Sequence, residues 1–116
     1  MTVVLTLLTP PPSLNGAFRN VPGKGRVKTK AYKDWRQDAA WQIKAQRPPR
    51  FGETVAISIQ VPRSVKADLD NLNKAVLDAL QDAGVVANDR QCERVSICRS
   101  GVALTTIHIT SYVGED

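Results

Sequence analysis

Carboxylates and one lysine gather in two short stretches of the sequence. Residues 68–74 read DLDNLNK, and Asp89 follows later. If the first stretch begins in an extended conformation, the side chains of Asp68 and Asp70 point to the same side of the chain. Two carboxylates held close together repel each other unless a cation or a proton lies between them. Carboxylate oxygens are ligands that Mg²⁺ or Mn²⁺ takes, so the pattern is compatible with a divalent-metal site.

A helix is expected to position these groups. Its apolar stripe predicts a helix over Asp70–Ala83, with the first residue as its N-cap and Gly84 as its stop. Lys74 then lies one turn beyond the cap, on the same face. The helix is about 20 Å long, and an extended Val85–Asp89 would run back about 17 Å. We therefore expect Asp89 near the start of the helix, so that three carboxylates and one lysine share one end.

A purely structural interpretation of the same residues stays open. Aspartate at a helix start is a good cap, and Lys74 and Asp78 have the i,i+4 spacing of an ordinary surface ion pair. The expected return of Asp89 to the same end is what raises the metal interpretation to equal weight. An EF-hand is excluded, because Leu72 and Asn73 stand where that loop needs a ligand and a glycine.

The remaining hydrophobic patterns predict a single α+β domain over residues 1–116. The expected elements, in the order β-α-β-α-β-β, are a strand over 2–8, a helix over 30–46, a strand over 54–61, the helix over 70–83, and strands over 92–99 and 102–112. Ser100-Gly101 is typical of a hairpin turn between the last two strands. We expect a largely antiparallel or mixed sheet with both helices packed on one face.

Basic residues dominate the first half of the chain. The whole chain has 16 Lys and Arg against 11 Asp and Glu, a net charge of +5, which favours a polyanion or an anionic surface as partner. Residues 13–29 hold three glycines and are expected to form a basic loop or an extended hairpin. A solvated loop is the alternative to DNA contact. The candidates for phosphate contacts in and beside it are Arg19, Lys24, Arg26, Lys28 and Lys30.

Composition also excludes several classes of protein. No apolar run approaches the length of about 20 residues that a membrane span needs, and the N-terminus lacks the features of a signal peptide. Cys92 and Cys98 would stand about 20 Å apart along one strand, too far for a disulfide, and with the single His108 they are too few for a zinc site. We therefore expect a cytoplasmic protein without a membrane partner.

Trp41 is set apart from the other aromatic residues of its helix. Tyr32 and Trp35 belong to the apolar stripe over 30–46 and are expected in the core, whereas Trp41 falls on the opposite face. A lone exposed Trp is unusual, and a chain of this size has a modest core. We therefore expect Trp41 to lie in a subunit interface of a homodimer.

The sequence resembles the RusA family of Holliday junction resolvases. The family's aspartate-x-aspartate-asparagine-leucine stretch, its following lysine and its late aspartate are similar to Asp68–Leu72, Lys74 and Asp89. Further similarities extend along most of the chain: Pro12-Ser13-Leu14-Asn15, Lys30-Ala31-Tyr32, Asp78-Ala79-Leu80 and Ala83-Gly84. One departure is Asn88, where many members carry the first of two aspartates; it bears on a fourth carboxylate and not on the three.

The resemblance implies an endonuclease that cuts four-way DNA junctions by two symmetric nicks, uses Mg²⁺ and acts as a homodimer. Carried over by position, Asp68, Asp70 and Asp89 would be the catalytic, metal-binding carboxylates and Lys74 the catalytic lysine. No small-molecule cofactor is implied. A non-enzymatic nucleic-acid-binding module is the first alternative. A nucleotide-handling phosphotransferase is the second, although the chain has no glycine-rich phosphate loop.

Overall fold

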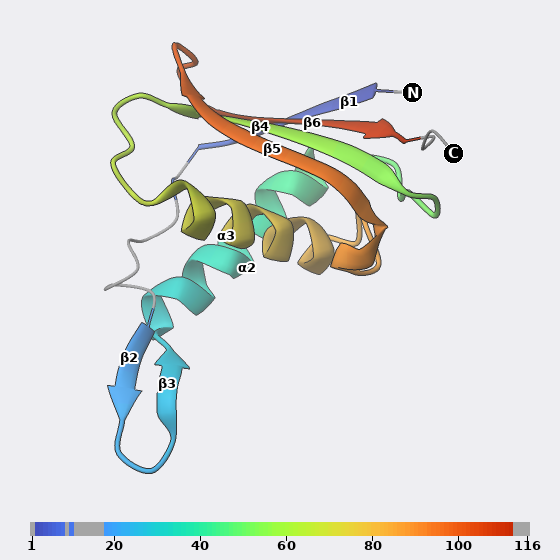
Figure 1. Cartoon of the computed structure of the whole chain (residues 1–116). Coiled ribbons are helices and arrows are strands. Elements are labelled where there is room, and N and C mark those ends of the chain that lie inside the picture. The colour runs from blue at the N-terminus through green and yellow to red at the C-terminus, as the bar shows by residue number, and fades with distance from the viewer. Residues whose placement is uncertain (1, 9, 11–17, 113–116) are drawn as a thin grey trace.

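The fold is a four-stranded sheet with two helices on one of its faces and a separate two-stranded hairpin (Figure 1). The computed structural model of the chain describes residues 2–8, 10 and 18–112. Its elements are β1 (Thr2–Leu7), β2 (Phe18–Val21), β3 (Gly25–Lys28), α2 (Lys30–Ala45), β4 (Val55–Pro62), α3 (Leu69–Asp82), a 3₁₀ turn (Asp89–Gln91), β5 (Cys92–Ser100) and β6 (Thr105–Ser111). The expected α+β class and the two helices on one face of the sheet are confirmed.

The sheet is mixed, with the strand order β1-β6-β4-β5. β4 pairs with β5 in parallel and with β6 in antiparallel fashion, and β1 pairs with β6 in antiparallel fashion. The predicted hairpin between the last two strands is wrong, because β4 lies between them. The cause is the crossover through α3: it returns the chain parallel to β4 on one side, and β6 takes the other side.

β4 is one of the two inner strands of the sheet, and its buried and less buried residues alternate along its whole length. Val55, Ile57, Ile59 and Val61 are all buried on the face that meets the helices, as the sequence predicted. The α3 stripe (Leu72, Ala75, Val76, Ala79 and Leu80) packs against this face. α3 ends in a Schellman motif: Gly84 has φ +80°, its N–H donates to Gln81, and the N–H of Val85 donates to Leu80.

α2 is fastened to α3 by polar as well as apolar contacts. Tyr32 and Trp35 are buried and stacked with ring centroids 6.2 Å apart, which confirms them as core residues. The Tyr32 hydroxyl donates to Asp78 at 2.9 Å, and the Arg36 guanidinium donates to both oxygens of Asp82 at 2.9 and 2.8 Å. Burial, followed by the bond to Asp78, raises the pKa of Tyr32 above its usual value. None of the described helices is long and apolar enough to cross a bilayer.

The basic segment before α2 contains a hairpin, the second of the two conformations expected for it. β2 and β3 pair in antiparallel fashion and project from the start of α2 away from the rest of the fold (Figure 1). A turn over 21–24 joins them, in which Gly23 has φ +79° and the Lys24 N–H donates to Val21. Thr29 then caps α2 by accepting from the N–H of Tyr32.

Candidate active site

The first two carboxylates lie together at the start of α3. Asp68 has extended backbone angles (φ −61°, ψ 130°), and its Oδ1 accepts from the N–H of Asp70 at 3.0 Å. The N-cap is therefore Asp68, and the prediction that Asp70 would be the cap is wrong. The helix starts earlier because the carbonyl of Asp68 already accepts from the N–H of Leu72. Both aspartates are exposed, and the positive end of the helix dipole favours their charge.

Lys74 stands one turn further along α3 with its ammonium free. Its side chain is exposed and makes no ion pair or hydrogen bond with the part of the chain that the structure describes. The surface pair with Asp78 that the structural interpretation expected is not formed. Asp78 instead accepts from Tyr32 and lies 3.8 Å from Arg36. Lys74 is thus available to an external anion beside Asp70.

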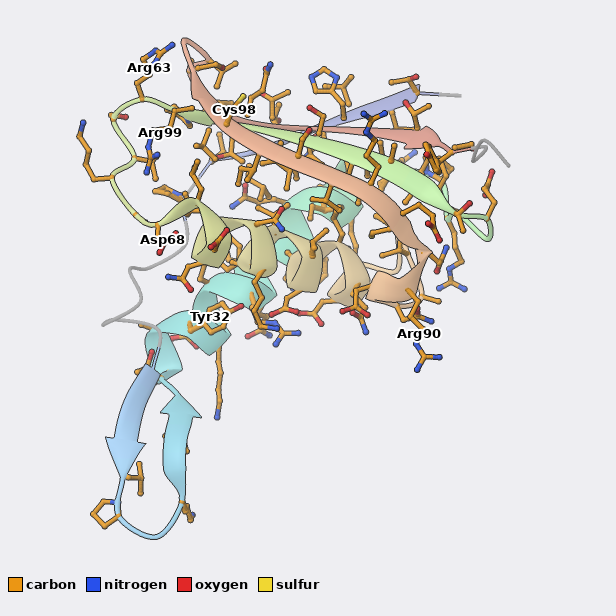
Figure 2. All side chains as sticks on the ribbon, in the orientation of Figure 1. Tyr32, Arg63, Asp68, Arg90, Cys98 and Arg99 are labelled. Carbon is orange, nitrogen blue, oxygen red and sulfur yellow. The ribbon has the colours of Figure 1, made fainter. Side chains whose placement is uncertain are left out.

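Asp89 lies at the opposite end of α3 within the same chain. Figure 2 shows Asp68 and Arg90, the neighbour of Asp89, at the two ends of this helix. Asp89 opens the 3₁₀ turn just before Cys92, which pairs with Val55 at the beginning of β4. Burial, with a smaller contribution from the charge of Asp89, raises the pKa of the Cys92 thiol. The expected return of Asp89 to the start of the helix is therefore wrong.

The segment after α3 does not return along the helix because Gln91 folds it in place. The side chain of Gln91 accepts from the N–H of Ala87 at 2.6 Å and donates to the carbonyls of Phe51 and Glu53 at 2.7 and 3.0 Å. These bonds tie residues 87–91 to the chain entering β4. The 14 residues of α3 correspond to about 21 Å, which is the scale of the separation between Asp68 and Asp89.

One chain thus presents two carboxylates, and not three, at the start of α3. No group of three or more Asp, Glu, His or Cys side chains with metal-site geometry occurs among the described residues. Two exposed carboxylates still suit Mg²⁺, which is commonly held by one or two carboxylates with water and substrate phosphate completing its shell. Asp68 and Asp70 therefore fit a divalent ion, but as part of a ligand set.

Arg99 holds the chain segment that leads into Asp68, and the sequence interpretation did not include it. It lies near the end of β5, and its guanidinium donates to the carbonyls of Val65 and Ala67 at 3.0 and 2.6 Å (Figure 2). Ala67 directly precedes Asp68, so Arg99 fixes the backbone from which the cap side chain projects. An arginine in a strand next to hydrophobic positions Val95 and Ile97 was the available signal, but no spacing rule connects it to residues 65–67.

Comparison with known proteins decides the family. Residues 8–110 match the family described as Endodeoxyribonuclease RusA. The protein named crossover junction endodeoxyribonuclease rusA, from Enterobacteria phage HK97, is 30% identical over 92 residues, which cover 77% of this chain and 76% of that protein. This chain belongs to the RusA family. It is accordingly an endonuclease, and RusA-type nucleases depend on divalent metal ions.

The basic residues proposed for DNA contact in this RusA family member lie on or next to the hairpin. Arg19 is in β2, Arg26 and Lys28 are in β3, and Lys24 is exposed in the turn between the strands. Lys30 opens α2 and forms an exposed ion pair with Asp34 at 3.3 Å, which an anionic strand can replace. The hairpin gathers these positions on one projection, whereas Pro12–Asn15 lies outside the described residues.

Three other residues singled out in the sequence are placed as follows. Trp41 is 67% exposed on α2, which confirms its position opposite the apolar stripe. His108 is on the sheet face opposite the buried Ile107 and Ile109. Cys92 and Cys98 are free thiols. None of these side chains is near Asp68 and Asp70 in sequence or on the same element.

Proposed function

We propose that this RusA family member resolves four-way DNA junctions by paired symmetric nicks, with Mg²⁺ as its metal and a homodimer as its active form. The observation that carries the proposal is the exposed pair Asp68 and Asp70 beside the unpaired Lys74 at the start of α3. The name of the phage HK97 relative supports a crossover junction as the substrate class. Mn²⁺ is expected to substitute for Mg²⁺, because both take carboxylate oxygens.

Hydrolysis of a phosphodiester requires charge stabilisation at the phosphate and a positioned water. A bound Mg²⁺ supplies Lewis-acid polarisation of the scissile phosphate. Asp68 and Asp70 would hold the ion, and the bond between Asp68 and the N–H of Asp70 fixes the first of these side chains. Lys74 places a positive charge where the phosphate becomes more negative, and the N-terminal end of the α3 dipole acts in the same direction.

The position of Asp89 supports a role for a second copy of the chain. If Asp89 is the third catalytic carboxylate, it cannot act with Asp68 and Asp70 of its own chain, because α3 separates them by about 21 Å. Two copies related by a two-fold axis, with their α3 helices antiparallel, bring Asp89 of each beside the first turn of the other. Two equivalent sites result, as paired nicks require.

The outer edge of β5 is the surface we propose for this contact. β5 has nine residues and pairs only with β4, so one side of its backbone is unpaired in the described chain. Val95 and Ile97 face the helices but stay half-exposed, because no strand lies beyond them. Antiparallel pairing of two β5 strands about Ser96 would cover both residues and align the two α3 helices as the site requires.

The catalytic part of the proposal is tested by metal-dependent cleavage of a synthetic four-way junction. We expect nicking in Mg²⁺ with wild type and none with Asp70→Asn, while Asp38→Asn, an acid of α2 that binds Gln42, cuts normally. Junction binding without cleavage by wild type in any divalent ion would favour the non-enzymatic binding module. Turnover of free nucleotides in the absence of DNA would favour the phosphotransferase.

The dimer is tested separately by cysteine cross-linking across the two-fold axis. Ser96 is exposed, and in the proposed pairing it lies opposite its own copy at a Cα separation of about 5 Å, within disulfide range. In a Cys98→Ser background, Ser96→Cys should form covalent dimers under mild oxidation. Val4→Cys, exposed on β1 at the other edge of the sheet, should not. Equal cross-linking of the two variants would reject the β5 contact.

A further inference from the structure

The outward face of α2 carries a shallow hollow built around an exposed tryptophan. Trp41 is 67% exposed, whereas Trp35 on the same helix is 6% exposed. The hollow has a volume of about 420 Å³. We call it the Trp41 hollow. It is lined by Lys33, Arg36, Gln37, Ala40, Trp41, Lys44 and Asp82. Among the described residues, neither Asp68 and Asp70 nor the hairpin contributes to it.

The free charges of the Trp41 hollow are positive. Arg36 and Asp82 form an ion pair with two hydrogen bonds, so their charges offset each other and both side chains are held in place at one side of the hollow. The ammonium groups of Lys33 and Lys44 have no carboxylate partner among the described residues. The Lys44 Nζ lies 6.0 Å from the centroid of the Trp41 ring. An exposed indole therefore stands between two cations that are available to an anionic ligand.

Helical spacing places these groups in one row. Lys33, Gln37, Trp41 and Lys44 follow one another at intervals of four, four and three residues on the same side of α2. The two lysines are thus about 16 Å apart along the helix axis. One strand of B-form DNA advances that distance in about five phosphates. The two cations are spaced to contact phosphates of one polynucleotide strand, and the aromatic ring between them can stack on an accessible base of that strand.

We propose that the Trp41 hollow binds DNA at the branch point of the junction, with the exposed face of a base stacked on Trp41 and the flanking phosphates near Lys33 and Lys44. In an intact duplex each base is covered on both faces, whereas a branch point interrupts the stacking. The hollow would therefore favour a junction over linear DNA. This inference rests on the proposed function and adds to it a means of recognising the substrate.

The charge of the hollow argues against a second copy of the chain as its occupant. A two-fold contact across the hollow would bring together two surfaces whose free charges are the cations Lys33 and Lys44, because Asp82, the one carboxylate in the described lining, is already bound by Arg36. DNA, by contrast, is complementary to the two free cations. The hollow also borders Asp82, the last residue of α3. A strand bound there passes the end of α3 that leads to Asp89.

Fluorescence and binding measurements on an Asp70→Asn background, which prevents cutting, test the inference. The probes are a four-way junction and a linear duplex with the same arm sequence. We expect the junction, but not the duplex, to quench Trp41 emission and shield it from acrylamide, while buried Trp35 contributes little to either signal. Trp41→Ala should weaken junction binding about tenfold and leave duplex binding unchanged. Trp41→Phe should retain part of the affinity.

Two further variants separate stacking from charge. Lys44→Ala should weaken binding to the junction and reduce the slope of log junction affinity against log salt by about one, and it should leave duplex binding unchanged. Val4→Ala, an exposed apolar residue on β1, should change nothing. Unchanged junction affinity of Trp41→Ala would overturn the inference and leave the proposed function standing. Conversion of Trp41→Ala to a monomer in light scattering would assign Trp41 to a subunit interface and also overturn it. Failure of wild type itself to bind or cut junctions would reject the proposed function.

Discussion

Mixing two inactive variants offers a sharp test of whether each catalytic site draws on two copies of the chain. Asp70→Asn removes a carboxylate at the start of α3, and Asp89→Asn removes one beyond its end. Each variant alone has two defective sites and should not cut. In a mixed dimer one site receives both substitutions, and the other combines Asp68 and Asp70 from one chain with Asp89 from the other, all intact.

The size of the effect follows from counting sites. Random association of equal amounts gives mixed dimers as about half of the population, and each has one intact site of two, so about a quarter of the wild-type sites are restored. The assay uses a supercoiled plasmid with a cruciform and two differently tagged chains that are expressed together. Nicked circles should appear and linear product should not, since linearisation requires two cuts. Complete inactivity of the purified mixed dimer would refute a shared site and return Asp89 to a structural role.

Four other substitutions or conditions have defined outcomes. Asp70→Asn should keep or tighten junction binding in a mobility-shift assay, because loss of one anion reduces repulsion toward phosphate; weaker binding would count against the site. Ca²⁺ should support binding without cleavage, since its longer and looser coordination does not enforce the geometry of Mg²⁺, and full cleavage in Ca²⁺ alone would contradict a metal site of this kind. Arg99→Ala should raise the Mg²⁺ concentration needed for half-maximal cleavage, because Arg99 holds the backbone just before Asp68, and Arg99→Lys should recover part of the effect. If Arg99→Ala lowers thermal stability but leaves the Mg²⁺ requirement unchanged, Arg99 has only a structural role. Gly84→Ala should lower the free energy of unfolding by about 1–2 kcal/mol, measured by urea denaturation, because φ is +80° there and an added Cβ would lie 3.2 Å from Arg50; an unchanged midpoint would contradict this account.

Local patterns in the sequence were sufficient for the elements but not for their pairing. The alternation through Val55–Val61 and the helical stripe of α2 predict these elements because each depends on residues close in sequence. The choice of which strands pair with one another does not depend on residues close in sequence. Ser100-Gly101 is compatible with a hairpin, yet Ile107 and Ile109 pair with β4 instead. Which side of β4 is free depends on the α3 crossover, and no short window of sequence contains that information.

The sequence predicted which residues belong to the candidate site but not how the fold positions them. The motif identified Asp68, Asp70 and Lys74, while the choice of cap between two aspartates two residues apart depended on where the first helical hydrogen bond forms. The position of Asp89 was beyond sequence reasoning, because it depends on the bonds that Gln91 makes to a segment about 40 residues earlier in the chain. Arg99 escaped notice for the same reason, since its partners are 32 and 34 residues away.

The distance between the ends of α3 means that the proposed dimer would prevent cleavage by a single chain, in addition to placing two cuts symmetrically. A lone chain of this net positive charge would bind duplex DNA without regard to structure, and a complete site on it could nick wherever it bound. With Asp68 and Asp70 at one end of α3 and Asp89 at the other, a lone chain would hold an incomplete carboxylate set if the proposed shared site is correct. Pairing of two chains would complete both sites at once and fix their separation. Cleavage would then depend on a substrate that presents two scissile phosphates related by the same two-fold axis, which a four-way junction does and a linear duplex bound at random does not.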